Sequence, residues 1–152
     1  QQLYRESVQI ASGYADNYNK YSFSLQDFQK QMQSLGEYLS AQIWIMDNQG
    51  NILFDSTDES VGKDAANANY KTLRGFNTSD FGNRYYMTGN FYGSFSEKNL
   101  TVFSPITSNY RIHSYVMIHK TVSSITQNAN GFMNILFYTI KSATCYRLRS
   151  FF

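Results

Sequence analysis

Two histidines are the residues whose side chains could do the most chemistry in this sequence. His113 and His119 are separated by an even number of positions, so on a single strand both side chains would lie on the same face. An imidazole pair can bind a metal or respond to pH near neutrality. Because no cysteine and no well-placed third ligand accompanies them, we predict no metal site. We interpret both as sheet histidines, with ligand contact or a pH response as the alternatives.

Acidic residues are the second group with catalytic potential, and they crowd around one short region: Asp47, Asp55, Asp58, Glu59 and Asp64. They lie among turn residues, where Asp and Asn usually stabilise backbone geometry. The sequence also contains no Gly-x-Ser-x-Gly motif and no phosphate-binding glycine loop. We therefore predict no catalytic residues and no cofactor, in a domain that is not itself an enzyme.

Composition limits the remaining classes of protein. The chain has 152 residues, enough for one domain with a sizeable core. Its formal net charge is +2 and only 16% of its residues are charged, so we expect no nucleic-acid partner. The aromatic content of 17% suits interfaces and ligand pockets, but it is equally typical of β-sheet. The single cysteine, Cys145, excludes an internal disulfide.

Two helices are predicted before any strand. Between Leu3 and Tyr18, the apolar residues form one helical stripe: Tyr4, Val8, Ala11, Ala15 and Tyr18. This seam would pack on the domain's own sheet, with an identical helix of a second chain as the alternative. Ser24 and Asp27 then form a capping-box pattern that begins a second helix. Its apolar face comprises Leu25, Phe28, Met32, Leu35 and Leu39.

Five strands are predicted after the helices. The stretch from Gln42 to Ser56 indicates a β-hairpin around a solvent-facing turn, Asp47 to Gly50, with Trp44 and Phe54 in the sheet core or on a pocket floor. Three further strands follow, at Arg84 to Phe95, Leu100 to Ile106 and Arg111 to Lys120. The connections between these three are short, so they should pair as an antiparallel meander.

The long connection between these two groups of strands runs from Thr57 to Asn83 and contains a predicted short helix, Asp64 to Leu73. Long connections in compact domains are often functional, so it would cover a pocket as a lid or form a solvated insertion. A last helix is predicted within Thr121 to Asn130. This order of elements defines an α+β fold, a five-stranded antiparallel sheet with long N-terminal helices and a C-terminal helix.

The ends of the chain indicate a piece of a longer protein. It begins at Gln1 without an initiator methionine or a signal peptide. The apolar run from Phe132 to Ile140 is shorter than the roughly 20 residues that span a bilayer, and we interpret residues 131–140 as the start of a transmembrane helix. Residues 141–152 are interpreted as a vector-derived tail, with a native basic juxtamembrane segment as the alternative. The domain itself would occupy residues 1–130.

Several stretches of this sequence resemble one family of receptors: YLSAQIWIMDNQGNILFDS, GNFYGSF, LTVFSPI and YRIHSYVMIHKTVSSI. Over Tyr4 to Ile125 the chain is similar to the extracytoplasmic PAS-like sensor domains, of the Cache type, found in membrane-bound histidine kinases of Gram-positive bacteria. The resemblance implies an extracellular domain between two transmembrane helices at the cell membrane. It also implies a homodimer in the full-length receptor.

A ligand site follows from this resemblance. In PAS-like domains a small ligand lies on the concave face of the sheet beneath the long loop, held by a few polar groups. The candidates by position are Arg74, Arg84, Tyr86, Thr88, Tyr92 and Ser104. Because arginine pairs well with carboxylates, an acid or an amino acid is the expected ligand class.

Other functions stay open at this point. A filled sheet without any ligand is one alternative, and a module that binds a protein partner through exposed tyrosines is another. The same kind of domain could also serve a chemoreceptor or a cyclase in place of a histidine kinase.

Overall fold

The computed structural model describes residues 1–18, 25–61 and 71–127. The chain divides into two compact units, Gln1–Thr121 and Val122–Phe152. The second unit contributes one described helix, α3 (Val122–Gln127), within the range predicted for the last helix. In these described ranges no helix is long and apolar enough to cross a membrane. The predicted membrane segment at residues 131–140 and the tail at 141–152 lie outside them.

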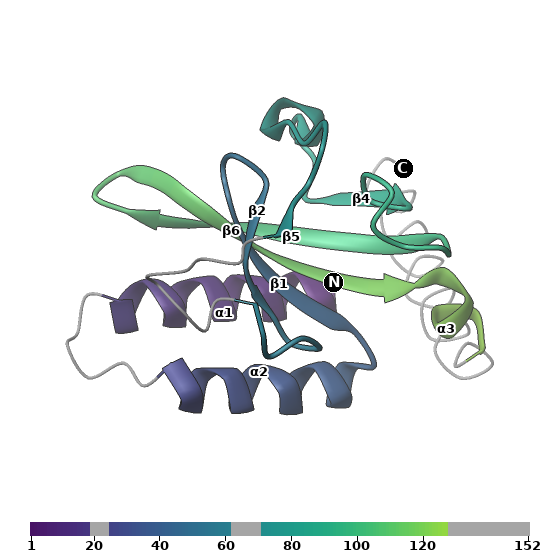
Figure 1. The fold of residues 1–152 in the computed structure, drawn as a ribbon, viewed down its shortest axis with the longest axis horizontal. Helices are drawn as coiled ribbons and strands as arrows, with labels where there is room; N and C mark the ends of the chain where they lie inside the picture. Colours follow the sequence, from purple (N-terminus) through teal and green to yellow (C-terminus); the bar gives the residue numbers. More distant parts are fainter. Residues whose placement is uncertain (19–24, 62–70, 128–152) are drawn as a thin grey trace, which may run out of the picture. The chain divides into compact units, whose positions relative to one another are not determined.

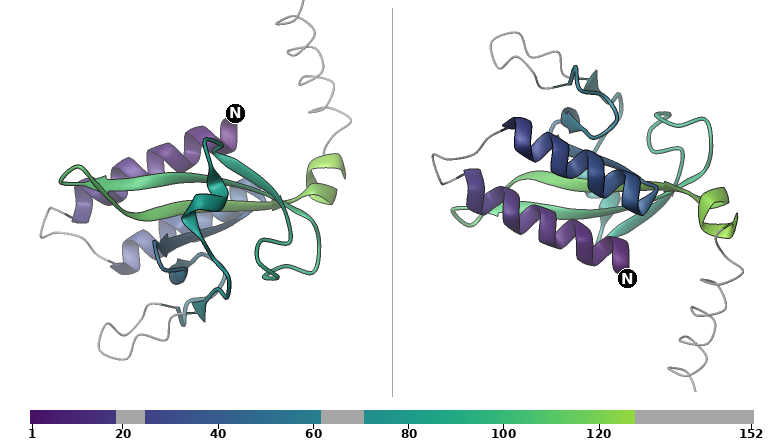
Figure 2. Two further views of the ribbon diagram at one scale, coloured as in Figure 1. Left: turned by 90° about the horizontal axis from the view of Figure 1, so that it is seen from above. Right: turned by 90° about the horizontal axis from the view of Figure 1, so that it is seen from below.

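The first unit is an α+β domain, as predicted, with both N-terminal helices on one face of an antiparallel sheet (Figure 1). The helices are α1 (Gln2–Tyr18) and α2 (Leu25–Leu39), and they lie side by side across that face (Figure 2). Ser24, the predicted cap of α2, lies outside the described residues. The apolar periodicity therefore predicted both helices, because each needs one face to bury against the sheet.

The sheet has six strands in the order β3-β2-β1-β6-β5-β4. Their bounds are β1 (Gln42–Asp47), β2 (Asn51–Asp55), β3 (Lys71–Thr72), β4 (Tyr86–Gly89), β5 (Asn99–Ser108) and β6 (Arg111–Thr121). The prediction of five strands was wrong because β3 is only two residues long, too short to show any alternation. It pairs with Asn51 and Ile52 of β2 and replaces the end of the helix predicted from Asp64; the part of that helix before Lys71 lies outside the described residues.

Strands β4, β5 and β6 form the predicted antiparallel meander. However, β4 (Tyr86–Gly89) is much shorter than the strand predicted from Arg84 to Phe95. After Gly89 the backbone turns away from the sheet, and Phe91 and Tyr92 adopt φ angles of 45° and 54°. Two consecutive non-glycine residues in this left-handed region cannot continue a strand. The alternation of aromatic residues here is therefore a property of a loop that packs on the sheet.

The β1–β2 hairpin is held by side chains of its own turn. The Asp47 carboxylate accepts hydrogen bonds from the backbone N–H groups of Gln49 and Asn51, both at 2.9 Å. Gly50 has a φ of +86°, and a Cβ there would meet the side chain of Phe76 at 2.9 Å. Glycine is therefore required twice over, by the turn and by the close approach of Phe76. Gly50 is also buried, so the turn is less solvent-facing than predicted.

Each face of the sheet carries its own apolar cluster. The helix-side cluster consists of Ile10, Ala11, Phe28, Met32, Leu39, Ile43, Ile45, Phe54, Val102, Ile106, Val116 and Ile118. The outer cluster consists of Trp44, Met46, Ile52, Val61, Phe81, Phe91, Phe103 and Met117. Trp44 and Phe54 are both buried, as predicted, but on opposite faces.

The buried side of α1 differs from the predicted seam. Tyr4 and Val8 are 37% and 39% exposed, whereas Ser7 and Ile10 are buried. Ser7 is completely buried, and its hydroxyl group is satisfied there by the Tyr4 carbonyl and the hydroxyl of Ser104 on β5, both at 2.7 Å. Serine is not counted as an apolar residue, so the periodicity of α1 did not include Ser7 in the face that contacts the sheet.

The Ser7–Ser104 contact gives a first prediction. Ser7→Ala should lower the free energy of unfolding by about 1–2 kcal/mol, because it leaves the buried Ser104 hydroxyl without its partner. Ser7→Ala combined with Ser104→Ala should recover part of this loss, since neither polar group then remains. Urea unfolding of Ser7→Ala, Ser104→Ala and the double variant measures the difference. A double variant that loses the full sum of the two single losses would contradict the coupling.

Candidate ligand-binding site

The outer face of the sheet is covered by the segment from Leu73 to Phe95, whose rings belong to the outer cluster or pack against it: Phe76, Phe81, Phe91, Tyr92 and Phe95. Phe81 stacks on Phe103 of β5 at a centroid distance of 3.9 Å, and Phe76 contacts Phe81 edge-on at 5.7 Å. The space beneath this part of the loop is thus occupied by the protein's own rings. Space for a ligand therefore lies beside this aromatic layer, not beneath it.

One end of the outer face holds an aromatic cage around His119, defined by Trp44, Phe91 and Phe95. The centroid of its imidazole lies 4.3, 4.9 and 4.8 Å from the ring centroids of Trp44, Phe91 and Phe95, respectively. Phe95 also stacks on Trp44 at 5.3 Å. Two polar atoms inside the cage are buried and have no hydrogen-bond partner among the described residues: Trp44 Nε1 and His119 Nε2.

The other imidazole nitrogen anchors His119 to the sheet. Nδ1 lies 2.7 Å from the hydroxyl of Thr101, its neighbour in register on β5. Burial lowers the pKa of His119 to about 3, because the surrounding rings cannot solvate an imidazolium. The cage therefore holds a neutral imidazole at physiological pH.

The loop that closes the cage is strained. Phe91 and Tyr92 both have positive φ angles, which cost about 1–2 kcal/mol for each such residue. The Tyr92 hydroxyl donates a 2.7 Å hydrogen bond to Asp80 and holds the loop in place. Burial, with a smaller contribution from this hydrogen bond, raises the pKa of Tyr92 to about 12, so the phenol stays protonated as the donor.

Beside the cage lies a cleft of about 640 Å³, a size typical of small-molecule sites. It is bounded by the C-terminal end of α2, the start of β1, the segment after β2, and the ends of β5 and β6. Its described lining residues are Gln33, Gly36, Glu37, Ser40, Ala41, Gln42, Ser56, Thr57, Phe95, Asn99, His119 and Thr121. Phe95 and His119 belong to both the cage and the cleft, so a ligand in the cleft would contact the cage directly.

The wall of the cleft is ordered by a buried carboxylate, Asp55, which is 3% exposed. It accepts hydrogen bonds from the backbone N–H and the hydroxyl of Thr57 at 2.9 and 2.8 Å, and from the amide of Gln42 at 3.1 Å. The hydroxyl of Ser56 accepts a hydrogen bond from the backbone N–H of Ile43 at 2.9 Å. These bonds fix the side chains of the wall before any ligand arrives.

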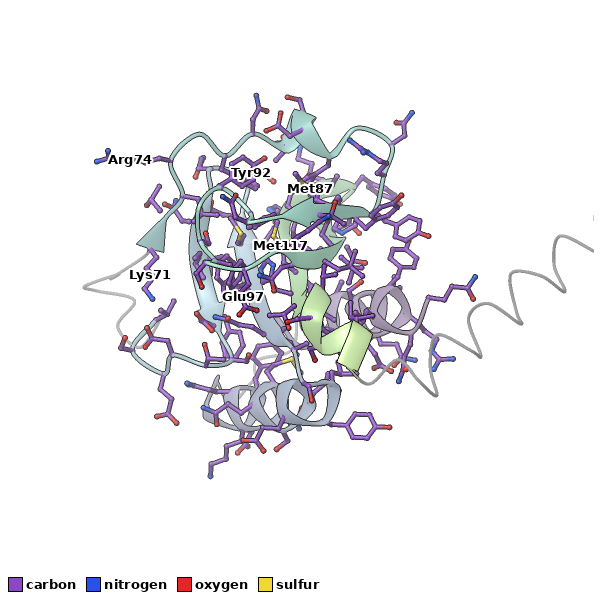
Figure 3. The ribbon with its side chains drawn as sticks, turned by 90° about the vertical axis from the view of Figure 1, so that its right-hand side faces the viewer. Lys71, Arg74, Met87, Tyr92, Glu97 and Met117 are labelled. Atoms are coloured by element: carbon purple, nitrogen blue, oxygen red, sulfur yellow. The ribbon has the colours of Figure 1, made fainter. Side chains whose placement is uncertain are left out.

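The residues predicted for the ligand site do not come together. Arg74 and Arg84 are exposed, and Figure 3 shows Arg74 projecting outward at the margin, away from Met117 on the sheet. Tyr86 and Thr88 lie exposed on the edge strand β4. No arginine lines the cleft among the described residues. A carboxylate in the cleft would therefore find no guanidinium there.

Two further predicted residues have structural partners. Tyr92 is bonded to Asp80 in the loop. Ser104 lies on the helix side of the sheet, where it meets Ser7 and lines a smaller cavity of about 240 Å³ between α1 and β5. None of the six predicted residues lines the larger cleft.

The two histidines have different surroundings although they share β6. His113 is exposed near one end and His119 is buried near the other, roughly 20 Å apart at the rise of a strand. Over the described parts of the chain, no group of three or more His, Cys, Asp or Glu side chains could hold a metal ion.

The cleft residues were missed because most of them are amides, hydroxyls and small residues at element ends, which look like caps and turns in a sequence. His119 was the available signal, since a histidine within an apolar strand must find a partner or stay neutral. Its pairing with Thr101 depends on strand register, which the sequence leaves open.

Comparison with known proteins gives no family for this domain. No model of a known protein family matches the chain, and no curated protein matches it. The fold and the site therefore define an α+β domain with N-terminal helices on a six-stranded antiparallel sheet and a cleft at one end of that sheet.

Proposed function

We propose that this chain is the extracellular signal-sensing domain of a membrane-bound two-component histidine kinase, and that it senses a small molecule. The sequence resemblance to PAS-like sensor domains supports the class of receptor. The arrangement of two N-terminal helices on an antiparallel sheet agrees with that resemblance at the level of fold. The domain would bind its ligand without transforming it.

The observation that carries the ligand proposal is the cleft with a fixed polar wall and an aromatic floor. Polar groups held in place by internal hydrogen bonds, beside an apolar surface, are the usual composition of a small-molecule site. Trp44 Nε1 and His119 Nε2 are buried next to this cleft without a hydrogen-bond partner in the described parts of the chain, and each such atom costs free energy. A ligand that repacks the cage could relieve that cost.

The route from the cleft to the membrane would run through the helices. The C-terminal end of α2 supplies Gly36 and Glu37 to the cleft, and Ser40 follows directly after it, so a bound ligand contacts this helix and the sheet together. A ligand that favours one position of α2 relative to the sheet would shift the population of two arrangements. In a dimeric receptor, such a shift would be passed on by the helices that lead into the membrane.

Blocking the cleft tests this proposal. Gln33→Trp places a large side chain in the cleft from the surface of α2, whereas Gln31→Trp places the same group on the exposed side of that helix. Isothermal titration with a panel of organic acids, amino acids, amines and short peptides should detect a ligand that the Gln31→Trp variant binds as the unchanged chain does. Gln33→Trp should weaken that binding at least about tenfold. If no compound binds, or if both variants bind equally, the small-molecule proposal is wrong.

A protein partner is the second candidate, and one observation favours it. Tyr4, Tyr85 and Tyr86 form an exposed aromatic group, with centroid distances of 4.5 Å between the first two and 5.5 Å between the last two. Exposed tyrosines of this kind often anchor protein interfaces. Tyr85→Ser should abolish binding of such a partner and leave small-molecule binding in the cleft unchanged.

A further inference from the structure

Three amide side chains in the cleft each use their NH2 group as a hydrogen-bond donor within the protein. Gln33 donates from Nε2 to the Glu59 carboxylate at 3.1 Å, and Asn99 donates from Nδ2 to the backbone carbonyl of Glu97 at 3.0 Å. Gln42 donates from Nε2 to the Asp55 carboxylate at 3.1 Å.

Each of these amides is held by a partner that can only accept. A carboxylate or a carbonyl has no proton to give, so none of the three amides can be flipped without losing its bond. For Gln42, a further bond to the Thr57 hydroxyl at 2.9 Å engages the second N–H. The amide oxygens are therefore the groups left for a ligand, and the cleft is rich in acceptors.

The charge of the cleft also favours a cation over an anion. Glu37 is exposed at its rim, and among the described lining residues no lysine or arginine is present. His119 stays neutral because of its burial. Lys120 lies outside the lining and donates at 2.8 Å to the carbonyl of Leu39, at the end of α2. Because this ammonium already binds the carbonyl at the end of α2, the acceptors available to a ligand are the side-chain oxygens of the cleft.

We propose that the cleft binds a small organic cation, an amine whose N–H groups donate to Glu37 and to the amide oxygens of Gln42 and Asn99. This inference rests on the proposed function, because it assigns a ligand class to the same cleft. The carbon chain of the amine lies against Phe95 and His119, and the ring of Phe95 also favours a cation. A carboxylate ligand would meet acceptors on every side.

Three probes of equal chain length separate these possibilities: putrescine, butanediol and succinate. They share a four-carbon skeleton and differ in charge, so a difference in affinity reports the electrostatic preference of the cleft. Isothermal titration of the full chain should show putrescine binding at least about tenfold more tightly than butanediol, and no binding of succinate up to about 10 mM. Added salt should weaken the binding of putrescine.

A charge variant with a matched control locates the site. Glu37→Gln should weaken putrescine binding about fivefold, and Glu6→Gln, which removes the same charge from α1 outside the cleft, should leave it unchanged. Equal or tighter binding of butanediol or succinate, absence of putrescine binding, or an unchanged affinity in Glu37→Gln would each overturn the cation inference. Binding of succinate or butanediol that Gln33→Trp blocks would leave the small-molecule function standing, so the two failures can be told apart.

Discussion

Acidification from about pH 6.5 to 4.5 is expected to lower the free energy of unfolding by about 2 kcal/mol through His119 alone. Burial holds the pKa of this imidazole at about 3 in the folded protein, against 6.5 when it is solvated. In this range the unfolded chain takes up the proton and the folded protein does not. The slope approaches about 1.4 kcal/mol per pH unit below pH 6.5, so the contribution of His119 to stability is present above its unfolded pKa and is lost as the pH falls toward about 3.

Variants isolate this contribution from that of the carboxylates. Thr101→Val combined with His119→Phe replaces both buried partners by apolar groups of similar shape, so stability near pH 7 should change little. Its unfolding free energy should lose the slope between pH 6.5 and 4.5. His113→Gln, at the exposed histidine of the same strand, should keep that slope. An unchanged slope in the double variant would show that His119 is not neutral in the folded state.

Removal of the cage's largest ring should have an effect of similar size. Trp44→Ala should lower the free energy of unfolding by about 3–5 kcal/mol, because Trp44 is 4% exposed and packs against Phe91, Phe95 and His119. Trp44→Phe should cost less than about 1.5 kcal/mol, since the indole N–H that it removes has no hydrogen-bond partner within residues 1–18, 25–61 and 71–127.

Chemical denaturation monitored by circular dichroism measures both losses. Tyr38→Ala is the control, because this side chain is 77% exposed on α2 and its removal should change stability by no more than about 0.5 kcal/mol. A cost for Trp44→Phe as large as that for Trp44→Ala would mean that the indole N–H makes an essential hydrogen bond within the cage.

Periodicity and turn residues predicted most of the fold because both are local properties. The hairpin around Asp47 to Gly50 and the α2 stripe containing Phe28 and Met32 were found where the apolar pattern and the turn chemistry agree. The errors arose where tertiary contacts override local pattern. Ser7 is buried against Ser104, a residue far away in the sequence, and the two-residue strand β3 exists only through its pairing with β2.

The candidate site was harder to predict than the fold, because it is assembled from the ends of separate elements. The amide of Gln42 meets Asp55 only because β1 pairs with β2, and His119 meets Thr101 only through the register of β5 with β6. Arg74 and Arg84 were predicted as ligand-binding residues because arginine pairs with carboxylates, but both are exposed outside the cleft. Residue type indicates what a side chain can do, and register decides which side chains act together.

The most direct test of the sensing proposal is nuclear magnetic resonance of the isotope-labelled chain, titrated with the panel of acids, amino acids, amines and peptides. At least one compound should shift backbone amide signals that are confined to the cleft, among them Gly36, Gln42, Thr57 and Asn99. If no compound shifts these signals, or if the shifts gather at Tyr4, Tyr85 and Tyr86 instead, the cleft is not the sensing site.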